Sequence, residues 1–87
     1  MGLFKIDLKG SFEHDLRKID RQFIPRIFEA IESLSKNPFS VQSRKMQGAE
    51  SSYRLRVGDY RVIYQVDTEK KMVTVYHARH RKDVYKR

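Results

Sequence analysis

The chain has 87 residues, with 19 lysines and arginines against 11 acidic residues and a net charge of +8. This length suits one small domain, which we expect to span residues 1–87. A charge of this sign favours a polyanionic partner: nucleic acid, an anionic membrane or an acidic protein. The absence of cysteine excludes a disulfide framework and a thiolate metal site. No apolar run approaches the roughly 18 residues of a membrane span, so we expect a cytoplasmic protein without a membrane partner.

The N-terminal segment predicts one strand followed by two helices. Apolar residues at 4, 6 and 8 alternate with polar ones, as in a strand with one buried face. Apolar residues then recur at helical spacing over 11–22 and again over 25–36, and Pro25 separates the two sets. Ser11 is the expected N-cap of the first helix, and Glu13 and Asp15 fit the positive end of its dipole.

The stretch YRLRVGDYRVIYQV, residues 53–66, predicts a β-hairpin with Gly58 and Asp59 as a two-residue loop. That loop pairs Arg56 with Arg61 and Arg54 with Ile63. The face toward the helices would carry Tyr53, Leu55, Val57, Tyr60, Val62, Tyr64 and Val66. The opposite face would carry Arg54, Arg56, Arg61, Ile63 and Gln65.

The rest of the chain adds a loop over 39–50, with room for a short strand near 44–47, and a strand over 72–79. The order of elements predicts an α+β fold: an N-terminal strand, a two-helix hairpin, and then an antiparallel three-stranded meander. We expect the helices to pack on one face of the sheet.

The arginines of the hairpin indicate an anion-binding face. Like charges directly opposite one another destabilise a strand pair by a few tenths of a kcal/mol, and solvated faces more often mix lysine with glutamate. Arginine suits planar, bidentate contact with phosphate. A solvent-screened surface without a ligand is the alternative.

The C-terminal stretch YHARHRKDVYKR continues this pattern. It interleaves cations with aromatic or titratable side chains, which together provide phosphate contacts, base stacking and proton transfer. The candidate RNA-binding residues are Arg56, His77, Arg79, His80 and Lys82. The alternative is a basic tail in which Tyr85 is a packing anchor. The histidines have no zinc-like spacing, so we expect no metal site and no other cofactor.

The segment YRLRVGDYRVIYQVDTEKKMVTVYHARHRKDVY resembles the C-terminal half of RelE/ParE-superfamily toxins, most clearly in GDYRVIYQV and HRKDVY. The resemblance implies a RelE-like microbial RNase fold and a RelB-like antitoxin as partner. RelE-type members enter the ribosomal A site and cut mRNA through attack by the 2′-hydroxyl. ParE-like members share the fold but poison DNA gyrase.

The resemblance also implies roles for individual residues. The family's catalytic basic residue maps onto Arg61, and a basic position in the preceding strand maps onto Arg54. The basic residues near the end map onto Arg79 and Arg81, and the terminal tyrosine maps onto Tyr85. Some RelE-type enzymes have two lysines where this chain has Ser52 and Arg54. An arginine stays protonated, so Arg54 can stabilise charge but is a poor proton donor.

In-line attack on a phosphodiester needs a base, donors to the oxyanion and an acid for the leaving oxygen. Arg61 and Arg54 are the candidate oxyanion donors, and Tyr85 is the candidate base because nearby arginines would stabilise its phenolate. Arg81, or a protonated His80 or His77, is the candidate acid. The scheme predicts a metal-independent endoribonuclease that acts on ribosome-bound mRNA and has no small-molecule substrate.

Two other functions remain open from the sequence. One is a ParE-like gyrase inhibitor without nuclease activity, and the other is a basic module that binds nucleic acid or the ribosome without toxicity. The combination of Arg61 with Tyr85 favours the nuclease, because a gyrase poison needs no base.

Overall fold

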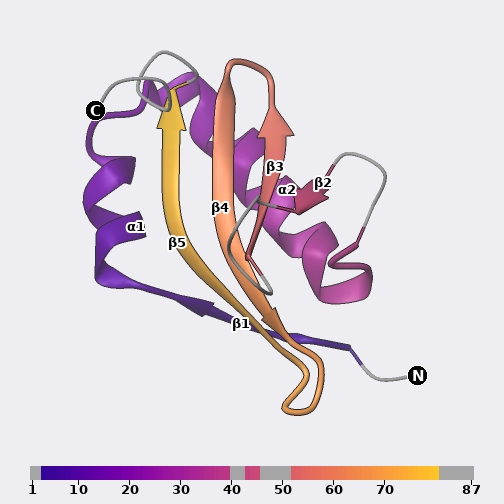
Figure 1. Cartoon of the computed structure of the whole chain (residues 1–87). Helices are drawn as coiled ribbons and strands as arrows, with labels where there is room; N and C mark the ends of the chain where they lie inside the picture. The colour runs from indigo at the N-terminus through magenta and orange to yellow at the C-terminus, as the bar shows by residue number, and fades with distance from the viewer. Residues whose placement is uncertain (1–2, 40–42, 46–51, 81–87) are drawn as a thin grey trace.

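The computed structural model describes residues 3–39, 43–45 and 52–80, which form one sheet with helices packed on it (Figure 1). The strand order is β1-β5-β4-β3-β2. In Figure 1, α2 lies behind β3 and β4, and α1 lies beside β5. The elements are β1 (Lys5–Leu8), α1 (Gly10–Leu16), the 3-10 helix η1 (Arg21–Phe23), α2 (Ile24–Lys36), β2 (Ser43–Lys45), β3 (Ser52–Val57), β4 (Tyr60–Asp67) and β5 (Met72–His80).

The α+β class is confirmed, while the sheet differs in detail from the expectation. It has five strands, because the short strand for which the loop had room near 44–47 is present at Ser43–Lys45 as β2 and pairs with β3. β1 pairs in parallel with β5, whereas the other neighbouring strands are antiparallel. No helix in the described part of the chain is long and apolar enough to cross a membrane.

The first helix is shorter than its periodicity predicts, since α1 ends at Leu16 rather than at residue 22. Beyond it, the backbone amides of residues 17–19 bond to carbonyls three residues earlier, which tightens the chain into turns. Asp20 then begins η1, because its carboxylate accepts the Gln22 amide at 3.2 Å. The two helices meet where the ring of Phe12 packs edge-on against Phe28.

The hydrophobic core lies between the sheet and the helices. β4 alternates strictly, with buried side chains at 60, 62, 64 and 66 and more exposed ones between them. α2 contributes Ile27, Ile31 and Leu34 to the same core. Burial on one face fixes the register, since a slip of one residue would turn every apolar side chain of β4 toward solvent.

The hairpin register is the one that the sequence predicts. Arg56 is opposite Arg61, and Arg54 is opposite Ile63. Gly58 has φ of +61°, and among the described residues the only other positive φ belongs to Lys71. Asp59 therefore has a negative φ, which is typical of a type II′ turn with glycine at its first central position.

A β-bulge in β5 changes which residues face the core. Ile63 pairs with His77 but Tyr64 pairs with Val75, so Tyr76 is the extra residue. Strict alternation from Val75 would turn His77 toward the helices. The bulge instead buries Ala78 and places His77 on the opposite face.

The buried hydroxyl of Tyr64 should contribute measurably to stability. It donates a hydrogen bond to the carbonyl oxygen of Pro38 at 2.7 Å and so ties the segment after α2 to β4. We expect Tyr64→Phe to lower the free energy of unfolding by about 1–2 kcal/mol, because a buried acceptor loses its donor. Urea denaturation gives this value. The matched control is Tyr76→Phe, because the Tyr76 hydroxyl donates to Gln65 at an exposed site. An equal loss of unfolding free energy in both variants would contradict this explanation.

The turn requires glycine at position 58 because of the positive φ there, and not because a side chain would clash with its neighbours. A Cβ at Gly58 would meet nothing within 4 Å, so the cost of Gly58→Ala comes from the positive φ alone. We expect a loss of about 1 kcal/mol in unfolding free energy. Gly10 is equally unobstructed, begins α1 and has no positive φ. Gly10→Ala should leave the denaturation midpoint unchanged or raise it, and a loss at Gly10 as large as that at Gly58 would refute this explanation.

Candidate nucleic-acid interface

Three arginines lie side by side across three strands, on the sheet face that points away from the helices. Arg61 of β4 is directly opposite Arg56 of β3 on one side and Arg79 of β5 on the other. Directly opposed residues project from the same face, so these side chains form one arginine row (Arg56, Arg61 and Arg79). Arg56 and Arg79 are exposed and Arg61 is half-buried. Such a row presents several planar donors to a polyanion.

A second level of side chains lies next to the arginine row. Arg54, Ile63 and His77 are aligned across β3, β4 and β5, and all three are half-buried. The structure thus brings together five of the predicted site residues: Arg54, Arg56, Arg61, His77 and Arg79. Ile63 gives this cationic face an apolar centre.

One carboxylate reaches this face from α1. Oδ2 of Asp15 lies 2.9 Å from Nδ1 of His77 and 3.9 Å from Nε of Arg79. The same oxygen accepts the backbone amide of Ala78 at 3.2 Å. The Asp15 side chain is only 12% exposed, whereas His77 and Arg79 are 29% and 45% exposed. The carboxylate is therefore an anchored part of the site and not a surface charge.

The N-terminal segment completes the edge of β5 beyond the last paired residue of β1. The Ser11 hydroxyl donates to the Tyr76 carbonyl oxygen at 2.6 Å, and Asp15 accepts from Ala78. The expectation that Ser11 caps the helix is wrong, because the N-cap residue is Lys9 and it makes no side-chain cap. Side chains of α1 thus continue the hydrogen bonding of β5 where the parallel strand stops.

The register places His80 away from the arginine row. His80 is opposite Tyr60, whose side chain is buried on the helix side, and the two rings pack edge-on with centroids 5.3 Å apart. A cavity of about 450 Å³ lies beside this pair. Its lining includes Asp15, Lys18 and Arg79. His80 and Lys18 therefore border the end of β5, and a role for His80 in RNA binding stays a prediction.

Three predicted residues, Arg81, Lys82 and Tyr85, lie outside the described residues, so their roles stay predictions. Within the described ranges, no group of three or more histidine, cysteine or acidic side chains is arranged to hold a metal ion. The polar groups of the interface that the described residues supply are arginines, His77 and the carboxylate of Asp15.

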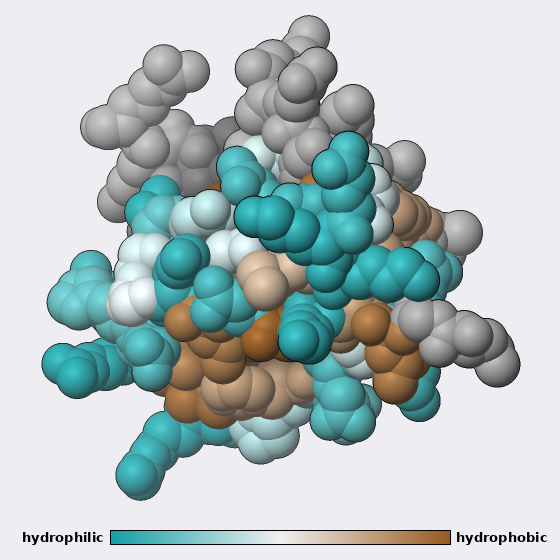
Figure 2. All heavy atoms as spheres, turned by 90° about the horizontal axis from the view of Figure 1, so that it is seen from below, coloured by the Kyte–Doolittle hydropathy of each residue, from teal (hydrophilic) through white to brown (hydrophobic). Residues whose placement is uncertain are grey.

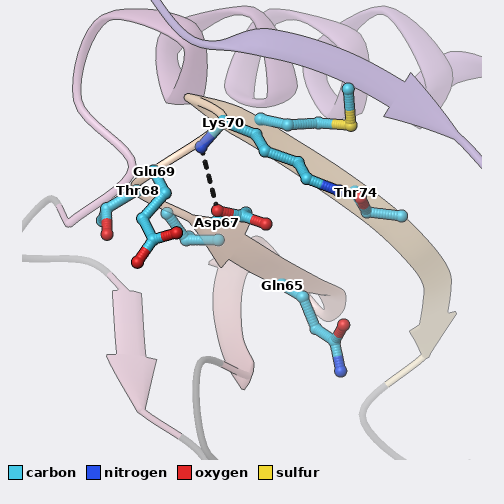
Figure 3. A pocket seen from close by; sticks show the side chains of 8 residues that line it. Gln65, Asp67, Thr68, Glu69, Lys70 and Thr74 are labelled. Carbon is cyan, nitrogen blue, oxygen red and sulfur yellow. Dashed lines mark hydrogen bonds between the residues drawn. The ribbon is translucent and has the colours of Figure 1, made fainter.

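A second hollow, of about 550 Å³, lies at the opposite end of the sheet, around the β4–β5 turn (Figure 3). Its polar lining mixes acidic Asp67 and Glu69 with Lys70 and the hydroxyls of Thr68 and Thr74. Asp67 accepts the backbone amide of Lys70 at 3.0 Å, which closes the turn. These charges are of both signs, so the hollow lacks the one-sided positive charge of the arginine row.

The surface also exposes apolar groups. Figure 2, which views the molecule from below, shows hydrophobic atoms gathered in the lower part of the view, with hydrophilic side chains around them. The large apolar side chains that are exposed among the described residues are Leu3, Phe28 and Phe39, at 64%, 39% and 47%. Apolar side chains that are exposed singly are common on protein surfaces, so these three residues alone do not define a contact surface.

Sequence reasoning missed the part that Asp15 plays. With a helix expected over 11–22, Asp15 looked like a favourable first-turn charge, but it lies in the last turn of α1. A negative charge near a helix C-terminus is unfavourable to the dipole. If the helix had been predicted to end at Leu16, the unfavourable position of Asp15 in the last turn would have indicated a role other than stabilising the helix.

Comparisons with known proteins agree with this architecture. A family model described as the ParE toxin of type II toxin–antitoxin systems, parDE, matches residues 6–85. Toxin RelG of Mycobacterium tuberculosis is 30% identical over 85 residues, which cover 97% of this chain and 98% of RelG.

Two solved structures are similar in fold. The RelBE2 toxin–antitoxin complex of M. tuberculosis contains a chain with a TM-score of 0.79 and 21% identity, covering 90% of this chain and 98% of that one. The RelB–RelE antitoxin–toxin complex of Methanococcus jannaschii gives a TM-score of 0.74 and 26% identity, with 91% and 94% covered. The chain therefore belongs to the ParE toxin family of type II toxin–antitoxin systems, within the RelE/ParE superfamily.

Proposed function

We propose that this toxin is a ribosome-dependent endoribonuclease that cleaves mRNA by attack of a 2′-hydroxyl on the adjacent phosphate. The attack transfers the 2′-proton to a base, forms a 2′,3′-cyclic phosphate and releases a 5′-hydroxyl after protonation of the leaving oxygen. Negative charge develops on the non-bridging oxygens during this step, so donors fixed in advance lower the barrier most.

The arginine row is the observation that carries this proposal. Arg61 is half-buried between Arg56 and Arg79, and the pairing of β3, β4 and β5 fixes the order of the three side chains. A donor that is half-buried between its neighbours, as Arg61 is, needs less reorganisation when charge develops than a fully exposed one. A solvated surface would gain nothing from like charges placed directly opposite one another.

The roles of individual residues follow from their places. Arg61, at the centre of the row, is the main oxyanion donor in this scheme, and Arg54 supports it from the neighbouring level. Arg79 contacts the scissile phosphate from β5 and Arg56 contacts the RNA backbone from β3. Tyr85 is proposed as the base, and Arg81 or a protonated His77 or His80 as the acid. His77 lies on the level next to the arginine row, and histidine gives up a proton more readily than arginine does.

We also propose a RelB-like antitoxin as the partner of this chain. Two related solved structures are toxin–antitoxin complexes that contain RelB or RelBE2. The net charge of +8 favours an acidic partner, and exposed apolar residues such as Phe28 offer it contact area. The small domain presents its cations on a sheet face, so the ribosome is proposed to supply the orientation of the mRNA.

A gyrase inhibitor of the ParE kind is the second candidate, and the match to the ParE toxin family favours it. The two candidates differ in their need for a chemical step. Inhibition of gyrase requires a binding surface alone, whereas RNA cleavage requires the central arginine to stabilise a transition state.

The central arginine should be required for cleavage in a reconstituted translation system. We expect Arg61→Ala to reduce the rate of mRNA cutting about 10²–10³-fold, because one oxyanion donor is lost. Mapping of mRNA 5′ ends by primer extension measures the rate. Arg26→Ala is the matched control, since Arg26 is an exposed arginine of α2 on the helix side of the sheet. It should cut like the wild type.

Three outcomes would contradict this proposal. Intact mRNA together with trapped gyrase–DNA cleavage complexes would support the gyrase inhibitor. Efficient cutting of naked mRNA without ribosomes would remove the ribosome from the scheme. An equal loss of cutting in Arg61→Ala and Arg26→Ala would indicate a general effect of charge and not a specific donor.

A further inference from the structure

Asp15 contacts both the backbone of β5 and two side chains of the candidate interface. Its Oδ2 atom receives the Ala78 amide at 3.2 Å, a backbone contact that locks the carboxylate against the strand edge. That same oxygen also lies 2.9 Å from Nδ1 of His77 and 3.9 Å from Nε of Arg79. One anchored carboxylate thus touches two side chains of the candidate interface.

The contact with His77 determines where the imidazole carries its proton. A carboxylate has only acceptor atoms, so Nδ1 must donate to it. In the neutral ring, Nε2 then carries the lone pair and is an acceptor, which Nη2 of Arg79 approaches at 3.5 Å in the free protein. Because Asp15 is bound to the backbone, the ring is held in this state by an oxygen that cannot readily move away.

The contact with Arg79 restricts the end of the arginine row. Nη2 of Arg79 lies 3.3 Å from Nδ1 and 3.5 Å from Nε2 of His77, so the guanidinium group sits beside the imidazole. Asp15 attracts the same guanidinium through Nε. An exposed arginine would otherwise sample many rotamers, and restricting it to one of them on binding RNA would cost conformational entropy.

We propose that Asp15 is a positioning residue that holds His77 as the Nδ1–H tautomer, with Nε2 as the acceptor for an RNA ribose hydroxyl, and that keeps Arg79 in the arginine row. Asp15 itself does not contact the RNA and acts through His77 and Arg79. The consequence for cleavage rests on the proposed function, whereas the tautomer is a property of the free protein.

The direct test is a long-range ¹H–¹⁵N NMR spectrum of the histidine rings, recorded at a pH at which His77 is neutral. The wild type should show a protonated Nδ1 and an unprotonated Nε2 for His77. In Asp15→Asn the amide can either accept from Nδ1 or donate to it, so a mixture of tautomers should appear. Glu13→Gln is the matched control, because it removes the same charge from an exposed residue of the same helix.

The second readout separates positioning from a purely structural role. Asp15→Asn should lower kcat for ribosome-dependent mRNA cutting about 10–100-fold, by analogy with the loss of carboxylates that orient metal-bound histidines. KM should change much less, and Glu13→Gln should match the wild type in both constants. A purely structural role would instead lower the amount of active protein and leave the His77 tautomer of the folded fraction unchanged.

Each outcome decides the proposal. A wild-type His77 protonated at Nε2, or an unchanged tautomer in Asp15→Asn, overturns it, and the wild-type spectrum suffices if the variant does not fold. A shifted tautomer with unaltered kcat overturns the role in cleavage. If the wild type does not cut mRNA at all, the proposed function fails, while the tautomer still decides whether Asp15 orients His77.

Discussion

The candidate interface depends on one extra residue in β5. The bulge at Tyr76 lets Val75 and Ala78 both face the core, although they are three positions apart. It thereby turns His77 and Arg79 to the sheet face that carries Arg61. Without the bulge, regular alternation along β5 would turn His77 and Arg79 toward the core together with Val75. The register of β5 against β4 therefore determines both which side chains enter the hydrophobic core and which arginines form the row.

The edge of β5 shows how the helical layer contributes to a surface on the other side of the sheet. β1 pairs with β5 only as far as Val75, and Ser11 and Asp15 of α1 satisfy backbone groups beyond it. Because Asp15 is bound at that edge, its carboxylate can reach His77. The short α1 is thus part of the support for the site, and its early end at Leu16 allows the chain to turn into η1 and α2.

Much of this arrangement could be predicted from sequence, because strong local signals determine it. The Gly58-Asp59 turn and the alternation around it predicted the pairing of Arg56 with Arg61, and the order of strands and helices along the chain predicted the α+β class. The bulge was not predicted, because its only trace in the sequence is that two core residues, Val75 and Ala78, are three positions apart and not two or four. The end of α1 was missed because the apolar spacing continues through Ile19, while hydrogen bonds to Asp20 favour a turn. The contact between Asp15 and His77 requires both the bulge in β5 and the early end of α1, so it could not be predicted from sequence.

The central claim is that Arg56, Arg61 and Arg79 act as one phosphate-binding row. It is tested most directly by titrating the toxin with a short RNA whose scissile position lacks the 2′-hydroxyl, while following the arginine Nε–Hε signals by NMR. We expect the signals of Arg56, Arg61 and Arg79 to shift together with one dissociation constant, and the signal of Arg26 of α2 not to shift. An unshifted Arg79, or an Arg26 signal that shifts as much as Arg61, would contradict it.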